Sequence, residues 1–231
     1  MCYNQRIGAY GVNCKGVLVM NLKNVLIFGD SYSTFKGYIP EGYATYYSEV
    51  EKPSTDVRAV TETWWYPLME ETRSELVLNN SWSGSTIGFT GYNNSDCSKT
   101  SSFIHRLDKL TEEKFFEKNE INTVFIFGGT NDSWSNAPLG TPKYSDWQKE
   151  DLYCVLPAIC YFIKRVKETL SGARVICIIN TEIKAEIADC LEAASKYFGA
   201  ESIRLKDIDK RSGHPTVKGM AQIKEQVMNS L

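Results

Sequence analysis

Residues 26–35 read LIFGDSYSTF, an apolar run that breaks into Gly29, Asp30 and Ser31. The apolar half is typical of a buried strand, and this strand ends by presenting a serine on a glycine-bearing turn. Four further short apolar runs, separated by helical patterns, occupy residues 76–78, 124–127, 175–179 and 203–205. Continuous apolar runs suit strands buried on both faces, and the helices between them supply the crossovers that parallel neighbours require. The sequence therefore predicts a doubly wound, parallel five-stranded sheet with helices on both sides.

Three apolar stripes with helical spacing predict helices that cover this sheet. They run through residues 152–170, 183–194 and 217–231. Pro215 suits the first turn of the last helix, and Pro157 either kinks the first of the three or marks its real beginning. Trp64 and Trp65 have the spacing of core residues in another helical segment.

Length and charge limit the possible functions. A chain of 231 residues can bury one sizeable core, so residues 20–231 are predicted to form a single domain. Residues 1–19 lack an amphipathic period and are expected to be a poorly ordered N-terminal extension. The net charge of -2, from 26 basic and 28 acidic side chains, provides no cationic surface for a phosphate backbone. Nucleic acid is therefore not expected as a partner.

Cysteine usage and hydropathy indicate the compartment. The seven cysteines are odd in number and have no C-x-x-C spacing, as expected for small core residues in a reducing compartment. No stretch reaches the roughly 18 apolar residues of a membrane span, and the first residues lack the continuous apolar region of a signal peptide. We therefore expect a cytoplasmic protein without a membrane partner.

Chemically active residues follow the predicted strands. The carboxyl ends of parallel strands share one edge of the sheet, where ligands bind in α/β folds. Ser31 follows the first strand, Gly84 the second and Asn131 the third, whereas His214 lies between the fifth strand and the last helix. Acyl transfer needs a hydroxyl nucleophile, a base, and donors aimed at the oxygen that gains charge. The pattern predicts Ser31 as nucleophile, His214 as general base, and an oxyanion hole formed by the Ser31 and Gly84 amides and the Asn131 side chain.

These segments together resemble the four marker blocks of the SGNH (GDSL-like) hydrolases. The blocks are residues 29–33 (GDSYS), the segment with Gly84, residues 128–132 (GGTND), and His214 with Pro215. They occur in the family's order and cover the chain from about residue 20 to 231. One block alone would be weak evidence, whereas four in register are specific.

The resemblance implies a flavodoxin-like three-layer α/β/α sandwich and hydrolysis of esters or thioesters, often of acyl groups on carbohydrates or lipids. It also implies that Ser31, Gly84, Asn131 and His214 are the signature residues of the site.

One position departs from the pattern of that family. The family commonly places an aspartate three residues before the histidine, and here that position is Arg211. In serine proteases, replacing the orienting acid lowers turnover by about 10,000-fold. Asp207 or Asp209 could substitute if the loop folds back, or a backbone carbonyl could hold the ring nitrogen and leave a Ser-His dyad. The sequence leaves these options open.

The function favoured by the sequence is a serine esterase that hydrolyses an acyl ester, foremost an acetyl ester, of a carbohydrate or other small molecule. The alternatives are a lipid acylhydrolase or thioesterase on the same fold, and a catalytically silent small-molecule-binding protein. No metal and no cofactor are predicted, because the two histidines lack ligand spacing and dinucleotide and phosphate-loop motifs are missing.

Aromatic residues crowd the loops near the predicted site and could stack on sugar faces or line an acyl pocket. They are Tyr38, Tyr43, Tyr46, Tyr47, Trp82, Phe89, Tyr92, Trp134, Tyr144 and Trp147. His105 lies within a predicted helix, away from the strand ends, and is expected to be structural.

Overall fold

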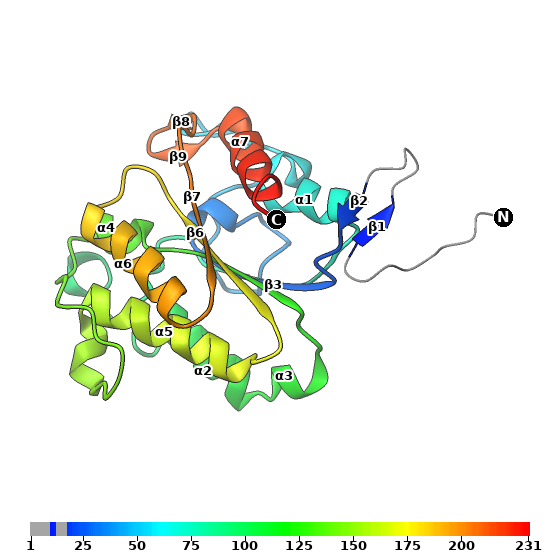
Figure 1. Ribbon diagram of the computed structural model, residues 1–231. Helices are drawn as coiled ribbons and strands as arrows, with labels where there is room; N and C mark the ends of the chain where they lie inside the picture. Colours follow the sequence, from blue (N-terminus) through cyan, green and yellow to red (C-terminus); the bar gives the residue numbers. More distant parts are fainter. Residues whose placement is uncertain (1–9, 13–17) are drawn as a thin grey trace.

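The computed structural model describes residues 10–12 and 18–231. Residues 1–9 and 13–17, most of the expected N-terminal extension, lie outside the described residues, so its poor order stays a prediction. In the described part of the extension, β1 (Tyr10–Val12) pairs antiparallel with β2 (Leu18–Met20) (Figure 1).

A parallel sheet forms the centre of the molecule (Figure 1). Its strand order is β4-β3-β5-β6-β7. Its strands are β3 (Asn24–Gly29), β4 (Glu75–Ser81), β5 (Thr123–Phe127), β6 (Arg174–Ile179) and β7 (Glu201–Arg204). The chain passes from β4 back across β3 to β5, so the topological switch point lies between β3 and β5. This order confirms the predicted flavodoxin-like α/β fold.

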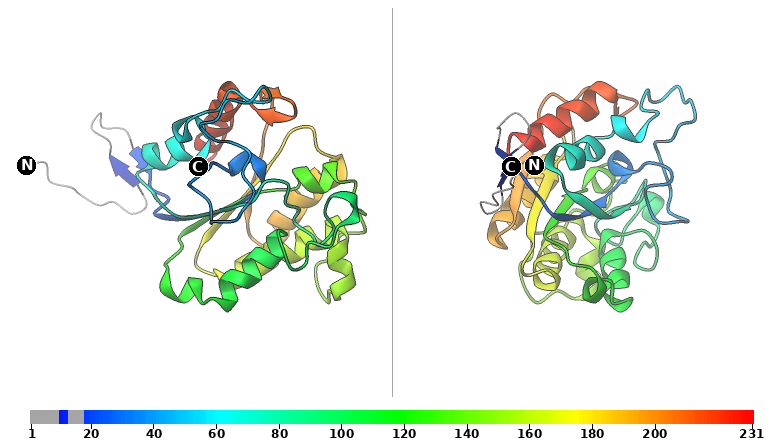
Figure 2. Two further views of the ribbon diagram at one scale, coloured as in Figure 1. Left: turned by 180° about the vertical axis from the view of Figure 1, so that it is seen from behind. Right: turned by 90° about the vertical axis from the view of Figure 1, so that its right-hand side faces the viewer.

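Two helical layers cover opposite faces of this sheet (Figure 2). One layer holds α2 (Phe103–Glu112), α5 (Val155–Thr169) and α6 (Ala185–Tyr197). The other holds α1 (Trp65–Thr72) and α7 (Val217–Met228). Shorter elements in the connections are η2 (Val60–Glu62), η3 (Tyr92–Asn94), α3 (Phe115–Lys118) and η4 (Lys149–Tyr153).

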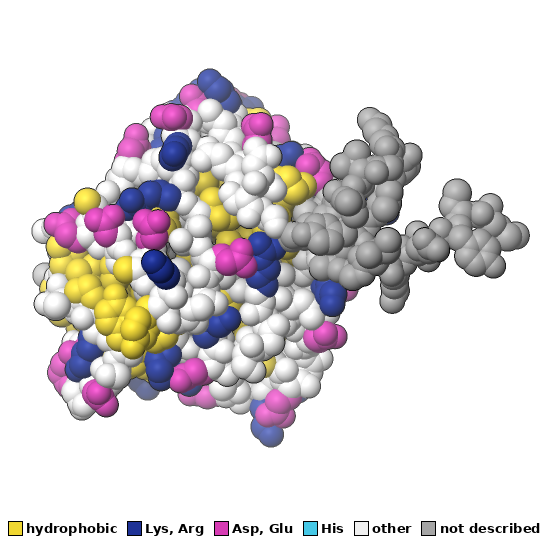
Figure 3. Space-filling view, in the orientation of Figure 1, with side chains coloured by type: hydrophobic (Ala, Val, Ile, Leu, Met, Phe, Trp, Pro, Cys, Tyr) yellow, Lys and Arg dark blue, Asp and Glu magenta, His cyan; other side chains and the backbone are white. Residues whose placement is uncertain are grey.

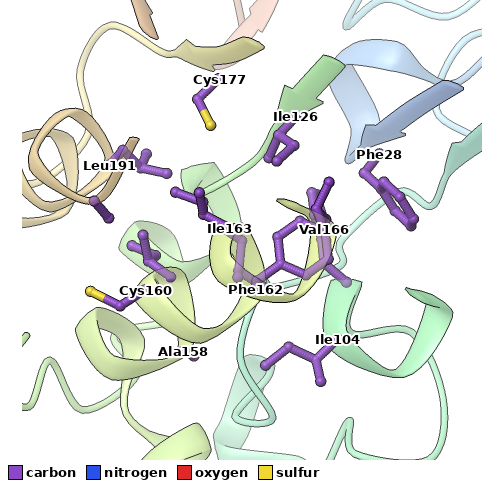
Figure 4. Packing of buried hydrophobic residues seen from close by; sticks show 14 of the residues in the cluster. Phe28, Ile104, Ile126, Ala158, Cys160, Phe162, Ile163, Val166, Cys177 and Leu191 are labelled. Atoms are coloured by element: carbon purple, nitrogen blue, oxygen red, sulfur yellow. The ribbon is translucent and has the colours of Figure 1, made fainter. Parts of the chain in front are cut away.

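Successive strand residues face alternate cores, which explains the unbroken apolar runs. In β5, Val124 and Ile126 belong to the core under α2, α5 and α6, whereas Phe125 and Phe127 belong to the core under α1 and α7. Phe162 of α5 lies in the first core (Figure 4) and meets the rings of Phe28 and Phe103 edge to face, at centroid distances of 5.3 and 5.6 Å. Such aromatic contacts fix how the helix sits on the sheet.

The element boundaries refine the predictions. Pro157 lies in the first turn of α5 and so marks the beginning of that helix rather than a kink. The placement of Pro215 in the first turn of the last helix is wrong: it lies in the short strand β9 (His214–Pro215), and Thr216 caps α7 by accepting a hydrogen bond from Gly219 N. Trp64 and Trp65 are buried, as predicted.

Charged side chains of both signs are interspersed on the face of the molecule shown in Figure 3. Within the described residues, no helix is long and apolar enough to cross a membrane.

Candidate active site

Ser31 and His214 meet at the carboxyl edge of the sheet. Ser31 opens a single helical turn, η1 (Ser31–Ser33), directly after β3, and Asp30 caps that turn by accepting a hydrogen bond from Tyr32 N. His214 begins β9, 183 residues away, yet its Nε2 lies 3.0 Å from Ser31 Oγ. This distance is within the range for direct proton transfer between a hydroxyl and an imidazole.

A tight hairpin presents His214. Its strands are β8 (Lys210–Arg211) and β9, visible beside the start of α7 in Figure 1, and the register places Arg211 opposite His214. The two loop residues, Ser212 and Gly213, both have positive φ angles, 50° and 77°. This is the twist that suits two-residue hairpins.

The second ring nitrogen of His214 faces a backbone carbonyl. Nδ1 lies 3.2 Å from Ser212 O, so the ring has a fixed tautomer with the proton on Nδ1. Asp209 instead accepts a hydrogen bond from the Thr216 hydroxyl, and Asp207 is an exposed turn residue with a φ of 52°. Of the three options that the sequence leaves open for the orienting group, the geometry corresponds to the backbone carbonyl.

Aromatic side chains surround the imidazole. The ring of Tyr46 lies parallel to it, with centroids 3.6 Å apart and planes inclined by 7°. Tyr32 and Tyr47 donate hydrogen bonds to the carbonyls of Gly213 and Pro215, on either side of the histidine. The three tyrosines thus hold the hairpin in place. For Tyr46 and Tyr47, the sequence had instead suggested contact with the substrate.

Gly84 and Asn131 lie in the two segments that follow β4 and β5. Gly84 has a φ of 82° and open space where a side chain would begin, so its backbone can be approached closely. Among the residues that the structure describes, the amides of Gly84 and Ser31 donate no hydrogen bond. Asn131, in α4 (Thr130–Trp134), donates from Nδ2 to Ser85 O at 3.0 Å and accepts from Tyr92 OH, which leaves one N–H of its amide.

A buried arginine, missed in the sequence, links the end of β3 to β4 and to the loop after it. Arg106 of α2 is 1% exposed and donates hydrogen bonds to Gly29 O, to the Asn80 side chain and to Ser85 Oγ. Burial lowers its pKa to about 9, so the guanidinium stays protonated at neutral pH. The only sequence signal was a basic residue within the apolar stripe of a helix, next to His105. Arg106 therefore fastens the end of β3 to the loop that carries Gly84.

Burial also lowers the pKa of His214, and the nearby ammonium of Lys210 acts in the same direction. A lowered pKa keeps the imidazole neutral at neutral pH, the form that can accept a proton from Ser31. In the described ranges, no three His, Cys, Asp or Glu side chains are grouped as metal ligands.

Comparison with known proteins identifies the family of this chain. The sequence model of the GDSL-like Lipase/Acylhydrolase family matches residues 23–231. The chain belongs to the GDSL-like lipase/acylhydrolase family. No curated protein matches this GDSL-like hydrolase.

Solved structures agree with this family. A candidate GDSL-like lipase from Bacteroides ovatus is 41% identical with a TM-score of 0.82; the alignment covers 90% of this chain and 97% of that one. A candidate GDSL-like lipase from Bacteroides uniformis is 43% identical with a TM-score of 0.83, covering 90% and 95%. An acetyl xylan esterase from Butyrivibrio proteoclasticus is 14% identical with a TM-score of 0.58, covering 94% of this chain and 65% of that one, and thus shares the fold.

Two buried carboxyl groups support the site of this GDSL-like hydrolase. Asp132 is 1% exposed and accepts hydrogen bonds from Ile87 N and Gly88 N, which anchors the loop after β4; burial raises its pKa to about 6. Asp30 is fully buried, and burial raises its pKa to about 7. Its second oxygen has no hydrogen-bond partner in the described part of the chain, and the neutral acid is favoured below about pH 7.

The raised pKa of Asp30 predicts that stability falls as the pH rises. Between about pH 4 and pH 7 the folded protein keeps a proton that the unfolded chain releases, so unfolding becomes more favourable across this window. We expect Asp30→Asn, which retains an acceptor for Tyr32 N, to lessen this fall by roughly 3 kcal/mol. Urea unfolding at several pH values measures it. Asp146→Asn, at an exposed position, serves as the control. The prediction would be contradicted if the free energy of unfolding depended on pH equally in the unaltered protein and in both variants.

Proposed function

We propose that this GDSL-like hydrolase is a serine esterase that removes a small acyl group, foremost acetyl, from a carbohydrate or similar alcohol. Membership of the family supports ester hydrolysis in general, and the acyl group and the alcohol are part of the proposal. The observation that carries the proposal is the 3.0 Å contact between Ser31 Oγ and His214 Nε2. A hydroxyl within hydrogen-bond distance of an imidazole with a lowered pKa supports the proposed roles of nucleophile and base.

The proposed reaction has two stages. Ser31 Oγ attacks the acyl carbon while its proton moves to His214 Nε2, and the carbonyl oxygen gains a negative charge. Three donors then stabilise that oxygen: the amides of Ser31 and Gly84 and the remaining N–H of Asn131. The proton passes from His214 to the alcohol oxygen as the ester C–O bond breaks. Water, deprotonated by His214, finally releases the acid from Ser31.

Carbohydrate is the proposed alcohol because two half-exposed aromatic rings stand beside this machinery. Trp134 is 39% exposed and lies 5.6 Å from the His214 ring, and Tyr92 is 39% exposed and bonds to Asn131. Flat rings of this kind can stack on sugar faces. Fold neighbours named as an acetyl xylan esterase and as family-two carbohydrate esterases from Clostridium thermocellum are consistent with this choice, although they share only the fold.

Covalent labelling tests the nucleophile. A fluorophosphonate is expected to add to Ser31, identified by mass spectrometry of the digest, because His214 activates that hydroxyl. Ser31→Ala should lose the label and lower kcat by about 10,000-fold or more. Ser83→Ala, in the neighbouring loop, is the matched control and should keep both. An unlabelled Ser31 together with a tightly retained small molecule would instead indicate a silent binding protein.

Removal of the two nearby carboxylates tests the dyad. Because His214 Nδ1 faces Ser212 O, Asp209→Asn and Asp207→Asn are each expected to change kcat/KM by less than about 3-fold, against roughly 10,000-fold for a working orienting acid. Initial rates on p-nitrophenyl acetate give the values. A loss of several thousand-fold in either variant would exclude the backbone carbonyl as sole partner.

A substrate panel tests the carbohydrate ester. Among p-nitrophenyl esters from acetate to octanoate, we expect the highest kcat/KM for the acetate, and acetylated sugars should also be hydrolysed. Trp134→Ala should lower kcat/KM for an acetylated sugar about 2- to 10-fold more than for p-nitrophenyl acetate, because only the sugar stacks on the Trp134 ring. Tyr197→Ala, exposed on α6, is the control. Equal losses of kcat/KM on both substrates would contradict stacking of the sugar on Trp134. Equal turnover of esters of every chain length would contradict the preference for acetyl.

A further inference from the structure

The stacking of Tyr46 on His214 is unusual for two neutral rings. With planes inclined by 7° and centroids 3.6 Å apart, the rings overlap almost completely. Neutral aromatic pairs prefer offset or edge-to-face arrangements with centroids about 4.5 to 7 Å apart. A face-to-face position suits a cation, because the face of an aromatic ring carries negative charge density.

The charges around His214 make such a cation hard to stabilise otherwise. When His214 takes the proton of Ser31 it becomes an imidazolium, but Nδ1 bonds to the neutral carbonyl of Ser212. Within the described residues, no carboxylate hydrogen-bonds to the ring. Titratable groups nearby include the hydroxyls of Tyr32 and Tyr47 and the Lys210 ammonium, whose charge opposes protonation. Lys210 is paired with Glu182 at 3.1 Å, and Lys52 lies 5.7 Å from the centroid of the Tyr46 ring.

We propose that Tyr46 is a positioning residue that stabilises the imidazolium of His214 through its ring face, in partial replacement of an orienting carboxylate. The inference rests on the proposed function, because only a working base becomes protonated during turnover. The ring face is the contributing part of Tyr46 in this proposal, since within the described residues its hydroxyl makes only a long, 3.5 Å contact with Ser54 O.

The loop that carries Tyr46 is fastened to the serine turn. Tyr46 N donates to Thr34 Oγ1 at 2.9 Å, and the same hydroxyl donates to Ser31 O at 3.0 Å. Lys52 Nζ donates to Tyr46 O and lies 5.7 Å from the centroid of its ring. The ring, the serine and the histidine therefore keep their relative positions.

Two substitutions separate the ring face from the rest of the side chain. Tyr46→Leu removes the aromatic face, and we expect kcat/KM for p-nitrophenyl acetate to fall about 5- to 30-fold. Tyr46→Phe keeps the face and should stay within about 3-fold of the unaltered protein. Equal losses in the two variants, with melting temperatures unchanged, would overturn the inference.

The pKa of His214 distinguishes the proposed role of Tyr46 from a merely structural one, because the two roles predict shifts in opposite directions. The chain has two histidines, so NMR titration can resolve His214 with His105 as internal reference. Loss of the ring face should lower the pKa of His214 by about 0.7 to 1.5 pH units. If Tyr46 only kept the site packed, its removal would let water reach His214, and the pKa would rise towards the ordinary value because burial now lowers it.

The two hypotheses fail separately. If no ester is hydrolysed and Ser31 resists labelling, the proposed function fails, yet the comparison of His214 titration in Tyr46→Leu and Tyr46→Phe still decides the role of the ring. If esters are hydrolysed but the His214 pKa is the same in both variants, or higher in Tyr46→Leu, the role of Tyr46 is overturned and the esterase stands.

Discussion

The position of β3 between two parallel neighbours is the constraint from which the candidate site follows. Its register pairs Gly29 with Ser81 of β4 and with Phe127 of β5, so three distant segments leave the sheet at one edge. The serine comes from the middle strand and the donor segments from either side of it. The guanidinium of Arg106 joins two of these segments, the end of β3 and the loop after β4, with hydrogen bonds that a buried cation must make.

The strands could be predicted because apolar runs are a local pattern. Ser31, Gly84 and Asn131 could be placed at one edge of the sheet because each follows a strand, whereas their catalytic roles and that of His214 stay a prediction. The sequence ended the second strand too early, at Leu78, because Asn79, Asn80 and Ser81 are polar. Their burial depends on distant partners: Asn79 Nδ2 bonds to Ser33 O, and Asn80 bonds to Arg106. Such long-range pairing leaves no periodic signal in a single sequence.

The surroundings of His214 were predictable only in outline. Aromatic residues near the site were expected to meet a substrate, but Tyr46 packs on the imidazole itself. The orienting group stayed open because spacing along a loop does not determine how the loop folds. Two consecutive residues with positive φ, Ser212 and Gly213, reverse the chain within the hairpin and bring the Ser212 carbonyl to the ring.

The contacts that align the imidazole with the serine are made by neutral groups. In the described residues they are a backbone carbonyl, the Ser31 hydroxyl and the faces and edges of aromatic rings. Dissolved ions screen attractions between opposite charges, yet they leave dipolar hydrogen bonds and ring packing almost untouched. These direct contacts should therefore depend little on ionic strength and hold in brine as in dilute buffer, whereas the ion pair of Lys210, on the same hairpin, with Glu182 is a charged contact that salt can weaken.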